Sequence, residues 1–407
     1  MPWTEIRAMD TRLCFIASYL RQEEAMSGLC LRYGISRKTG YKWVGRYLEA
    51  GAAGLEERSS APHRLVHAIS ATIADPILAL RRQRPTWGPR KLLARLAQDW
   101  PEMAWPAAST VGDLLRREGL SQPRRRRREQ AASTVPLLAP RAANESWSAD
   151  FKGWFRTGDG VRCEPLTVAD GYSRYLLACQ AVARTGVAEV RPILERLFRE
   201  HGMPRALRTD NGAPFASPTG LGGLSQLSVW LLKLDVWPDR IAPGRPDQNG
   251  RHERMHRTLA AEPAQSPAAS LAAQQRRFDL WREDFNHQRP HEALGQRCPG
   301  AFYTASPRAY PERIRDWGYP ADHHARRVSH DGYIRWQEAR IYVSEALAKE
   351  TIALAQRDDE DWIIRFRGFD LAILADAGHQ LQRSALAQSG QRRTNSENCH
   401  PGSRSRV

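Results

Sequence analysis

The first third of the chain carries hydrophobic residues at the spacing of amphipathic helices. Residues 7–23 predict a helix whose apolar side consists of Leu13, Ile16, Ala17 and Leu20. The same period predicts three more helices, over residues 75–82, 89–98 and 110–117. A stretch typical of a linker, residues 51–63, separates the first group from the second. The pattern therefore predicts two all-α modules, residues 1–60 and 65–120.

Residues 26–48 follow the order of a helix-turn-helix. Gly34 would make the turn and Ser36 would cap the second helix, which packs inward through Trp43, Tyr47 and Leu48. The groove-facing start of that helix would present four polar or basic residues: Arg37, Lys38, Thr39 and Lys42. An ordinary three-helix bundle with a basic face fits the same pattern, so DNA binding is a prediction at this point.

The second module shows residues that begin and end helices. Pro89 fits the first position of one helix, and Thr110 with Asp113 has the spacing of a capping box. Gly119 stands where a C-terminal cap belongs. Two tandem helical modules fit a protein that grips an extended DNA site, so we interpret residues 65–120 as a second DNA-binding module.

A connector rich in Pro, Ala and Ser follows over residues 121–143. It contains a run of five arginines: Arg124, Arg125, Arg126, Arg127 and Arg128. Such a run is typical of a solvated tether that binds phosphate without reading base sequence.

From residue 144 the period changes to the alternation of strands. Strands are predicted over residues 147–155, 163–169, 175–182, 206–209 and 236–241. Helices are predicted over residues 187–201, through Leu224 and Leu231, and around Glu253. The first three strands have short connections and form an antiparallel meander. The order β-β-β-α-β-α-β-α predicts an α/β domain.

Three carboxylates occupy special places in this domain. Asp150 lies within a strand, where aspartate is uncommon; Asp210 ends the fourth strand, and Glu253 lies on the last helix. Three convergent carboxylates need a cation to stay ionised together. Oxygen ligands suit Mg²⁺ or Mn²⁺, and two such ions can activate a hydroxyl and stabilise the leaving oxygen of a phosphodiester.

The stretch around Glu253 has a competing interpretation. His252-Glu253-x-x-His256 matches a zinc-metallopeptidase helix, in which both histidines bind the metal and the glutamate acts as general base. In the other interpretation, Glu253 is the third carboxylate, while Met255 and Leu259 form the apolar stripe that anchors the helix.

Five motifs decide between these interpretations: WSADFKG, DGYSR, RTDNGAPF, PGRPDQNGRHER and FNHQRPHEAL. In this order they closely resemble the insertion-sequence transposases of the retroviral-integrase (DDE) superfamily, over about residues 1–308. The resemblance implies an RNase H-like mixed five-stranded core over residues 144–308, with Asp150, Asp210 and Glu253 as catalytic metal ligands. It also implies that Asp170 is not one of the three. Further candidate DNA contacts are Lys152, Arg208, Asn249 and Arg251.

The C-terminal part again shows short strands. After a helix over residues 271–286, five strands are predicted between residues 325 and 376, and they suggest a small all-β barrel similar to the SH3-like domains of integrases. Residues 377–407 are polar and aperiodic, which predicts disorder.

The net charge and the spacing of the cysteines limit which partners and which kinds of site the protein can have. The 407 residues carry a net charge of +16 with a pI near 10.0, which indicates a polyanionic partner such as DNA. The six cysteines form no C-x-x-C pair, and no leader or membrane-spanning run occurs. We therefore expect a cytoplasmic, nucleoid-associated transposase that binds transposon ends and target DNA as a homo-oligomer. The alternatives are a zinc metallopeptidase and a non-catalytic helix-turn-helix regulator.

Overall fold

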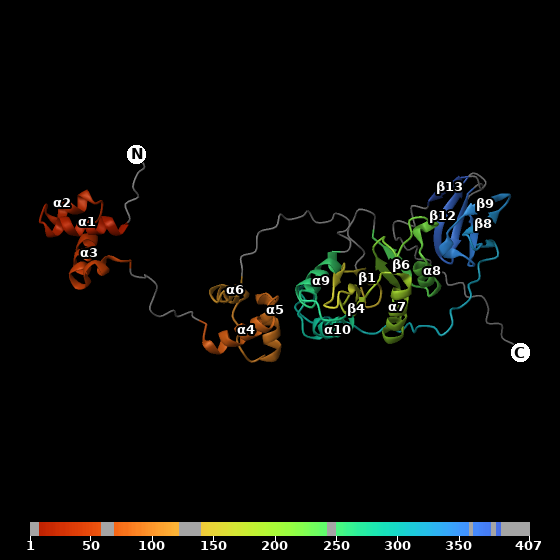
Figure 1. The fold of residues 1–407 in the computed structure, drawn as a ribbon, viewed down its shortest axis with the longest axis horizontal. Helices are drawn as coiled ribbons and strands as arrows, with labels where there is room; N and C mark the ends of the chain where they lie inside the picture. The colour runs from red at the N-terminus through yellow and green to blue at the C-terminus, as the bar shows by residue number, and fades with distance from the viewer. Residues whose placement is uncertain are drawn as a thin grey trace. The chain divides into compact units, whose positions relative to one another are not determined.

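A computed structural model describes residues 8–57, 69–121, 140–241, 250–357, 361–375 and 380–383 (Figure 1). The chain divides into two compact units, Met1–Ser70 and Ala71–Val407. The first unit contains helices α1 (Ala8–Leu20), α2 (Met26–Arg32) and α3 (Arg37–Ala50), followed by a 3-10 turn, η1 (Gly51–Leu55). The second unit contains the remaining helices and every strand that the described residues form.

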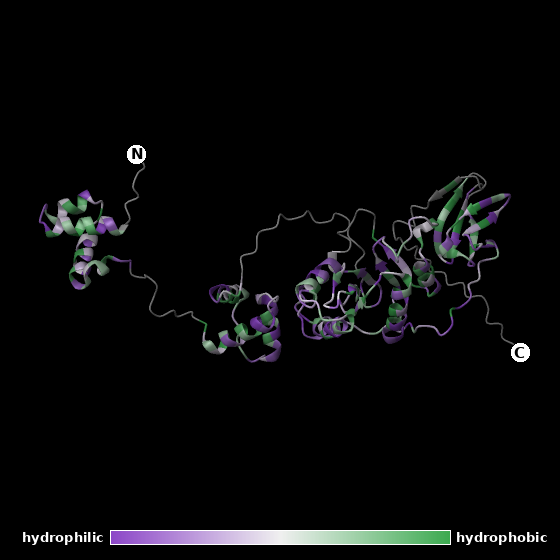
Figure 2. Cartoon of the chain, viewed as in Figure 1, coloured by the Kyte–Doolittle hydropathy of each residue, from purple (hydrophilic) through white to green (hydrophobic). Residues whose placement is uncertain are grey.

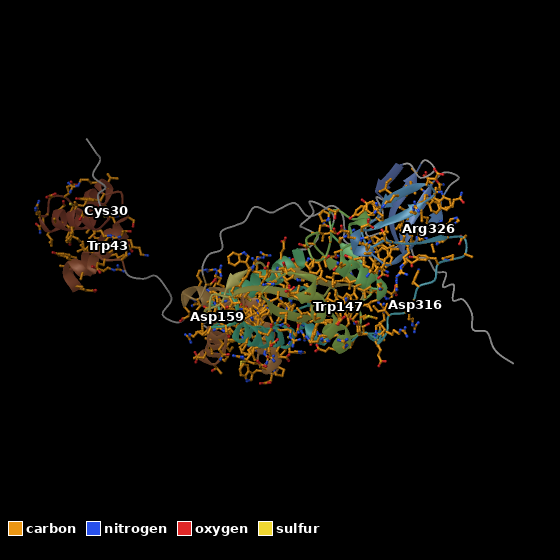
Figure 3. The ribbon with its side chains drawn as sticks, turned by 45° about the vertical axis from the view of Figure 1, so that its right-hand side comes forward. Cys30, Trp43, Trp147, Asp159, Asp316 and Arg326 are labelled. Atoms are coloured by element: carbon orange, nitrogen blue, oxygen red, sulfur yellow. The ribbon has the colours of Figure 1, made fainter. Side chains whose placement is uncertain are left out.

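The first unit has the helix-turn-helix that the sequence predicts. Gly34 adopts a positive φ of 66° at the turn, and the Ser36 hydroxyl accepts a hydrogen bond from the Thr39 amide at 3.2 Å. Trp43 is buried beside Cys30, as the side chains in Figure 3 show. The small core of this unit therefore fixes the angle between α2 and α3.

Three predicted core positions in this unit are wrong. Leu13, Leu20 and Leu48 are exposed. Phe15 is buried instead, because it packs edge-to-face on Tyr33 with ring centroids 5.4 Å apart. The predicted linker also begins too early. Leu55 of η1 is fully buried, so this turn belongs to the folded unit.

The second helical module consists of α4 (Ala71–Gln83), α5 (Pro89–Asp99) and α6 (Ala108–Arg117). Pro89 occupies the first turn of α5 as predicted, and Gly119 has the positive φ expected of a C-terminal cap. The predicted capping box at Thr110 is wrong, since α6 begins two residues earlier, at Ala108, and no side chain caps it. Burial of Val111, Leu114 and Leu115 sets the register of this helix.

The central domain is built on a mixed sheet with the order β2-β3-β1-β5-β6, in which β4 pairs with β3. The strands are β1 (Trp147–Phe151), β2 (Phe155–Arg156), β3 (Arg162–Asp170), β4 (Leu176–Val182), β5 (Ala206–Thr209) and β6 (Trp237–Arg240). β1, β3 and β4 pair antiparallel, whereas β1, β5 and β6 pair parallel. The predicted first strand is interrupted before β2, where Gly153 takes a φ of 91°.

Helices cover both faces of this sheet. On one face, Trp147 and Ala149 pack with α7 (Val187–His201) and α8 (Gln226–Lys233). On the other face, Cys163 and Cys179 pack with α9 (Gly250–Ala261) and α10 (Leu271–His287). Side chains alternate along β1, so Ser148 and Asp150 face α9. Green and purple segments are mixed throughout this domain, as expected of elements with one apolar and one polar side (Figure 2).

The C-terminal strands form an all-β region that packs against α8. A five-stranded sheet has the order β13-β12-β11-β10-β7, and β8 pairs with β9. The strands are β7 (His324–Arg327), β8 (Tyr333–Trp336), β9 (Ala339–Tyr342), β10 (Thr351–Gln356), β11 (Trp362–Phe366), β12 (Phe369–Ala375) and β13 (Gln380–Arg383). Val229 and Leu232 of α8 share the hydrophobic core of this region.

Two of these strands differ from the sequence-based expectation. β7 and β13 are short, polar edge strands without clear alternation, which is common at sheet edges. β13 lies within the tail that composition assigns to disorder, and residues 384–407 lie outside the described residues. Within the parts of the chain that the structure describes, every helix falls short of what a membrane span requires.

Candidate active site

The pairing of β1 with β5 brings two of the three predicted carboxylates to neighbouring strands. The parallel register sets Trp147 beside Leu207 and Ser148 beside Arg208. Continuing this register by two residues sets Asp150 beside Asp210, which directly follows β5. Neighbouring strands lie about 4.8 Å apart, so the two carboxylates share one region of the sheet.

The turn after β5 holds Asp210 in place. The Gly212 amide donates to Asp210 Oδ1 at 3.2 Å, and the side-chain amide of Asn211 donates to the Ile241 carbonyl at 2.8 Å. The Asp-Asn-Gly turn is thereby tied to the end of β6. Asp210 is half-buried at the end of a strand, which suits a side chain that meets a ligand from solvent.

Helix α9 approaches Asp150 from the other side. Met255 and Leu259 are buried in the cluster beneath the helix, as their spacing predicts, whereas Glu253 is exposed. The Nδ1 atom of His256 lies 4.0 Å from Asp150 Oδ2. Glu253 and His256 are neighbours at i and i+3 on α9, so they lie on the same side of the helix.

The two histidines of α9 meet a single threonine on β3. His252 Nε2 and His256 Nε2 lie 2.7 and 2.8 Å from Thr167 Oγ1, and His252 Nδ1 lies 2.9 Å from Ser148 Oγ. Burial, helped by the neighbouring His256, lowers the pKa of His252 to about 3. Burial and the positive charge of Lys152 lower the pKa of His256 to about 4. Both imidazoles are therefore neutral at physiological pH.

This arrangement does not favour a zinc-metallopeptidase site. A zinc site needs imidazole nitrogens that converge on a metal at about 2.0–2.1 Å, but here both Nε2 atoms converge on a hydroxyl group. Both histidines are buried. Among the described residues, no three His, Cys, Asp or Glu side chains form a group that could hold a metal ion as arranged, and this applies to Asp150, Asp210 and Glu253 as well as to the two histidines.

The carboxylates fit a hard divalent cation by their chemistry. Asp150, Asp210 and Glu253 offer oxygen donors alone, which is the preference of Mg²⁺ and Mn²⁺. Asp150 and Asp210 each follow the last paired residues of β1 and β5, Ser148 and Arg208, by two positions, and His256 in the middle of α9 lies 4.0 Å from Asp150. The eight residues before α9, 242–249, lie outside the described residues.

Asp170 serves the fold instead. It is almost fully buried, and its carboxylate accepts hydrogen bonds from the Asn144 amide at 2.8 Å and from the Ser173 amide and hydroxyl at 2.7 Å. These bonds close the turn between β3 and β4. A carboxylate with its oxygens occupied in this way is a poor metal ligand.

The predicted DNA contacts have different surroundings. Arg37, Lys38 and Lys42 are exposed at the start of α3, whereas the side chain of Thr39 is bonded to Ser36 at 2.9 Å. Arg208 forms an ion pair with Asp239 at 2.7 Å on the neighbouring strand, so it is already partly committed. Asn249 and the five arginines 124–128 lie outside the described residues, as does the side chain of Arg251.

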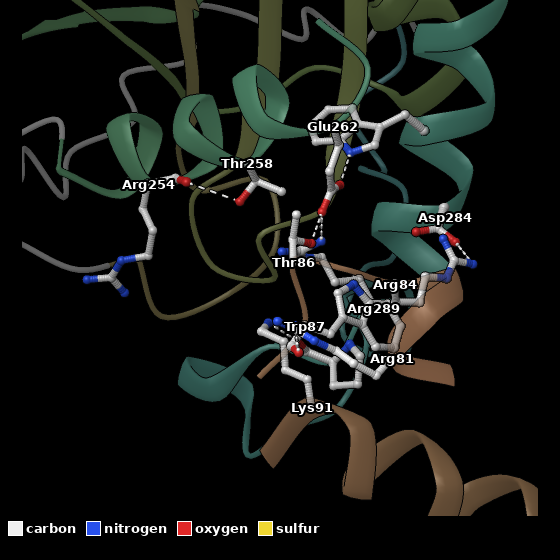
Figure 4. A network of polar contacts seen from close by, with 12 residues as sticks. Arg81, Arg84, Thr86, Trp87, Lys91, Arg254, Thr258, Glu262, Asp284 and Arg289 are labelled. Carbon is white, nitrogen blue, oxygen red and sulfur yellow. Dashed lines mark hydrogen bonds and ion pairs between the residues drawn. The ribbon is translucent and has the colours of Figure 1, made fainter. Parts of the chain in front are cut away.

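A further polar network, which the motifs did not indicate, lies just beyond the end of α9. Glu262 accepts hydrogen bonds from Arg289 at 2.6 Å, from Trp281 at 2.7 Å and from Thr86 (Figure 4). Thr86 belongs to the α4–α6 module, and Arg84 of the same module pairs with Asp284 of α10 at 2.5 Å. The α4–α6 module is thus attached to the central domain.

The contact between the α4–α6 module and the central domain contains both buried and charged side chains. Trp87 and Arg289 are buried in it. Lys91 donates to the Pro290 carbonyl, and burial together with Arg289 lowers the pKa of Lys91 to about 8. The only sign in the sequence that could have indicated this contact is the hydrophobic Trp87 in an otherwise polar loop.

Comparison with known proteins agrees with this architecture. Family models described as Integrase core domain match residues 140–246 and 234–299, a Helix-turn-helix domain matches residues 11–63, and a Homeodomain-like domain matches residues 39–115. The uncharacterized 31.7 kDa protein of insertion element IS407 from Burkholderia multivorans is 31% identical over 235 residues, or 56% of this chain and 80% of the relative. The 39.2 kDa protein of insertion element IS476 from Xanthomonas euvesicatoria is 29% identical over 44% of this chain and 50% of its own length.

Among solved structures, the HTLV-2 integrase catalytic core domain in complex with magnesium is similar with a TM-score of 0.32 and 12% identity, covering 40% of this chain and 97% of that one. The sequence matches place the chain in a class of DNA-processing enzymes. The chain belongs to the insertion-element transposases of the retroviral-integrase superfamily, and it is a DDE-type polynucleotidyl transferase.

Proposed function

We propose that this transposase binds the terminal inverted repeats of its insertion element, then cleaves and joins DNA strands at a centre formed by Asp150, Asp210 and Glu253. The observation that carries the proposal is the parallel pairing of β1 with β5, in which Ser148 lies beside Arg208 and the two aspartates follow at the same distance along each strand. The approach of α9 to Asp150 supports Glu253 as the third member.

The three carboxylates would hold two Mg²⁺ or Mn²⁺ ions. Such ions, when bound, activate the attacking hydroxyl and stabilise the leaving oxygen of a phosphodiester. The chain itself would supply the negative charge that binds the ions, and the paired strands β1 and β5 would hold the two aspartates. Lys152, whose charge acts on His256, would meet a DNA phosphate near this centre.

DNA recognition would be divided among several parts. Arg37, Lys38, Thr39 and Lys42 would enter the major groove from α3. The module α4–α6 would extend the site, and the arginine-rich connector would add contacts to phosphates. The C-terminal strands would form an SH3-like domain that binds DNA or another protomer. Bridging two transposon ends would require a homo-oligomer.

Assays with the full-length protein and duplexes that carry the element's ends test this function. The proposal expects strand cleavage that requires Mg²⁺ or Mn²⁺ and an affinity for end DNA above that for random DNA, falling steeply with salt. Binding to ends without cleavage in either metal would support the non-catalytic regulator. Zinc-dependent peptide cleavage would support the metallopeptidase. Either result would overturn the proposal.

A further inference from the structure

Thr167 stands at the centre of a buried hydrogen-bond junction between three elements. It is fully buried on β3 and lies directly across from Asp150 of β1 in the antiparallel register. Its hydroxyl donates to the Asp150 carbonyl at 3.0 Å. The same oxygen lies 2.7 Å from His252 Nε2 and 2.8 Å from His256 Nε2. One hydroxyl thus joins the strand of Asp150 to the helix of Glu253.

Counting protons fixes the direction of each bond. A threonine hydroxyl has one proton and two acceptor lone pairs. For all three contacts to be hydrogen bonds, the Thr167 proton must go to the Asp150 carbonyl, because a carbonyl oxygen cannot donate. Both histidines must then donate from Nε2 to the two lone pairs of Thr167 Oγ1. The hydroxyl of Thr167 is therefore fully satisfied, with one bond given and two received.

The same count fixes the role of Ser148. With its proton on Nε2, neutral His252 has an acceptor at Nδ1. Ser148 Oγ lies 2.9 Å from that atom, and only 3.4 Å from the Ala169 carbonyl. The Ser148 hydroxyl therefore donates to His252. The chain of bonds runs from Ser148 through His252 to Thr167 and on to the backbone of Asp150.

We infer that Thr167, with Ser148, His252 and His256, is a positioning device that sets helix α9 on strand β1 and so sets Glu253 relative to Asp150. The inference rests on the proposed function in one respect, since it takes Asp150 and Glu253 to act together on a metal ion. Thr167 is a positioning residue because its hydroxyl bonds to the backbone carbonyl of Asp150, whereas the proposed metal ligand is the Asp150 carboxylate.

Hydrogen bonds give this junction a precision that apolar packing lacks. Met255 and Leu259 anchor α9 through non-directional contacts, which tolerate small rotations and shifts of the helix. The two imidazoles lie one helical turn apart and are both directed at one hydroxyl group. Both contacts can form only at one rotation of α9 about its axis and one position along that axis. Glu253 directly follows His252 in the chain, so a rotation or shift of the α9 backbone at His252 moves the Glu253 carboxylate as well.

The decisive variant is Thr167→Val, which keeps the shape of the side chain and removes the hydroxyl. We expect its affinity for Mn²⁺, measured by titration calorimetry on the full-length protein, to fall about 10- to 100-fold, as when outer partners of metal ligands are removed. Thr167→Ser restores the hydroxyl and should bind Mn²⁺ within about threefold of the parent.

Thr157→Val is the matched control. Thr157 is also buried, and its hydroxyl makes bonds to Asp159 and Val161 within the β2–β3 turn, away from α9. This variant should lose thermal stability without losing Mn²⁺ affinity. The inference would be overturned if Thr167→Val kept the Mn²⁺ affinity of the parent. It would also be overturned if Thr167→Val lowered that affinity no more than Thr157→Val does.

Imidazole nitrogen chemical shifts, from NMR of protein labelled with ¹⁵N at histidine, test the junction without any metal. We expect both His252 and His256 as Nε2–H tautomers in the parent, each assigned with its own histidine replacement. An Nδ1–H tautomer at either residue would contradict the network, whether or not Thr167→Val folds. If Asp150→Asn binds Mn²⁺ like the parent, the proposed function fails, and the tautomers still decide the positioning role.

Discussion

Helix α9 is held at its two ends by polar networks of opposite character. Near its start, His252 and His256 are neutral and bond to hydroxyl groups. Just past its end, Glu262 bonds to the charged Arg289 and, through Thr86, to the α4–α6 module. The first network lies within one domain, whereas the second joins two modules.

The neutral network and the charged network suit different roles in the fold. A buried charge is costly unless it is paired, so a buried network that holds a helix permanently on a strand is better built from neutral groups. Charged pairs at a module boundary respond to salt and to competing phosphates. We therefore interpret the start of α9 as fixed and its far end as a salt-sensitive connection to the α4–α6 module.

Removing the central charge of the second network should have the largest effect on stability. Glu262→Ala leaves Arg289, which is 6% exposed, without its carboxylate partner. Breaking a buried pair in this way typically costs about 3–5 kcal/mol. We expect a loss of this size in urea unfolding. The control is Glu292→Ala, which removes an exposed pair with Arg90 and should cost less than about 1 kcal/mol. Equal losses of unfolding free energy in both variants would mean that the Glu262–Arg289 pair contributes no more than an exposed ion pair.

Acid should weaken the first network. The pKa values of His252 and His256 are lowered in the folded protein to about 3 and about 4. Between these values and the ordinary pKa near 6.5, the unfolded chain binds more protons, so stability falls as pH falls. The expected slope is roughly 1.4 kcal/mol per pH unit for each histidine.

Urea titrations at pH 7, 6 and 5 measure this slope. His256→Gln keeps a side-chain N–H donor but cannot take up a proton in this range. It should therefore reduce the slope by the contribution of one histidine. The group that opposes protonation of His256 is Lys152, and Asp150 Oδ2 lies 4.0 Å from its Nδ1. A variant whose slope equals that of the parent would show that His256 is already protonated or exposed in solution.

Added salt should weaken the second network and leave the first unchanged, and this is the smallest of the expected effects. Raising the salt concentration screens partly exposed pairs such as Arg84 with Asp284, which is worth about 0.5–1 kcal/mol at most. Amide hydrogen exchange should then become roughly two- to fivefold faster in α4–α6, while exchange in α9 near His252 stays constant. Faster exchange in both places would remove the distinction between them.

Local patterns in the sequence predict much of this architecture. The buried stripe of Met255 and Leu259 follows from helical spacing, and the cap at Ser36 follows from the residue type. Edge strands such as β7 escape prediction because they bury little and show no alternation. The interruption after β1 also depends on a single glycine, Gly153, with a positive φ.

The candidate site could be predicted only in part. The order of the motifs identifies Asp150, Asp210 and Glu253 as candidates. The partner of both α9 histidines, Thr167, is 85 residues from His252 and 89 from His256, so no local spacing reveals it. The contact of Glu262 with Thr86 spans 176 residues and is likewise visible only in the folded chain.

The most direct test of the three carboxylates is strand cleavage of end-containing DNA by single variants, with DNA binding measured in parallel. Asp150→Asn, Asp210→Asn and Glu253→Gln should each reduce cleavage at least about a thousandfold, equivalent to roughly 4 kcal/mol of transition-state stabilisation, while affinity for end DNA stays close to that of the parent. Asp279→Asn, an exposed change on α10, should cleave normally. Normal cleavage by any of the three variants would contradict the assignment of that carboxylate.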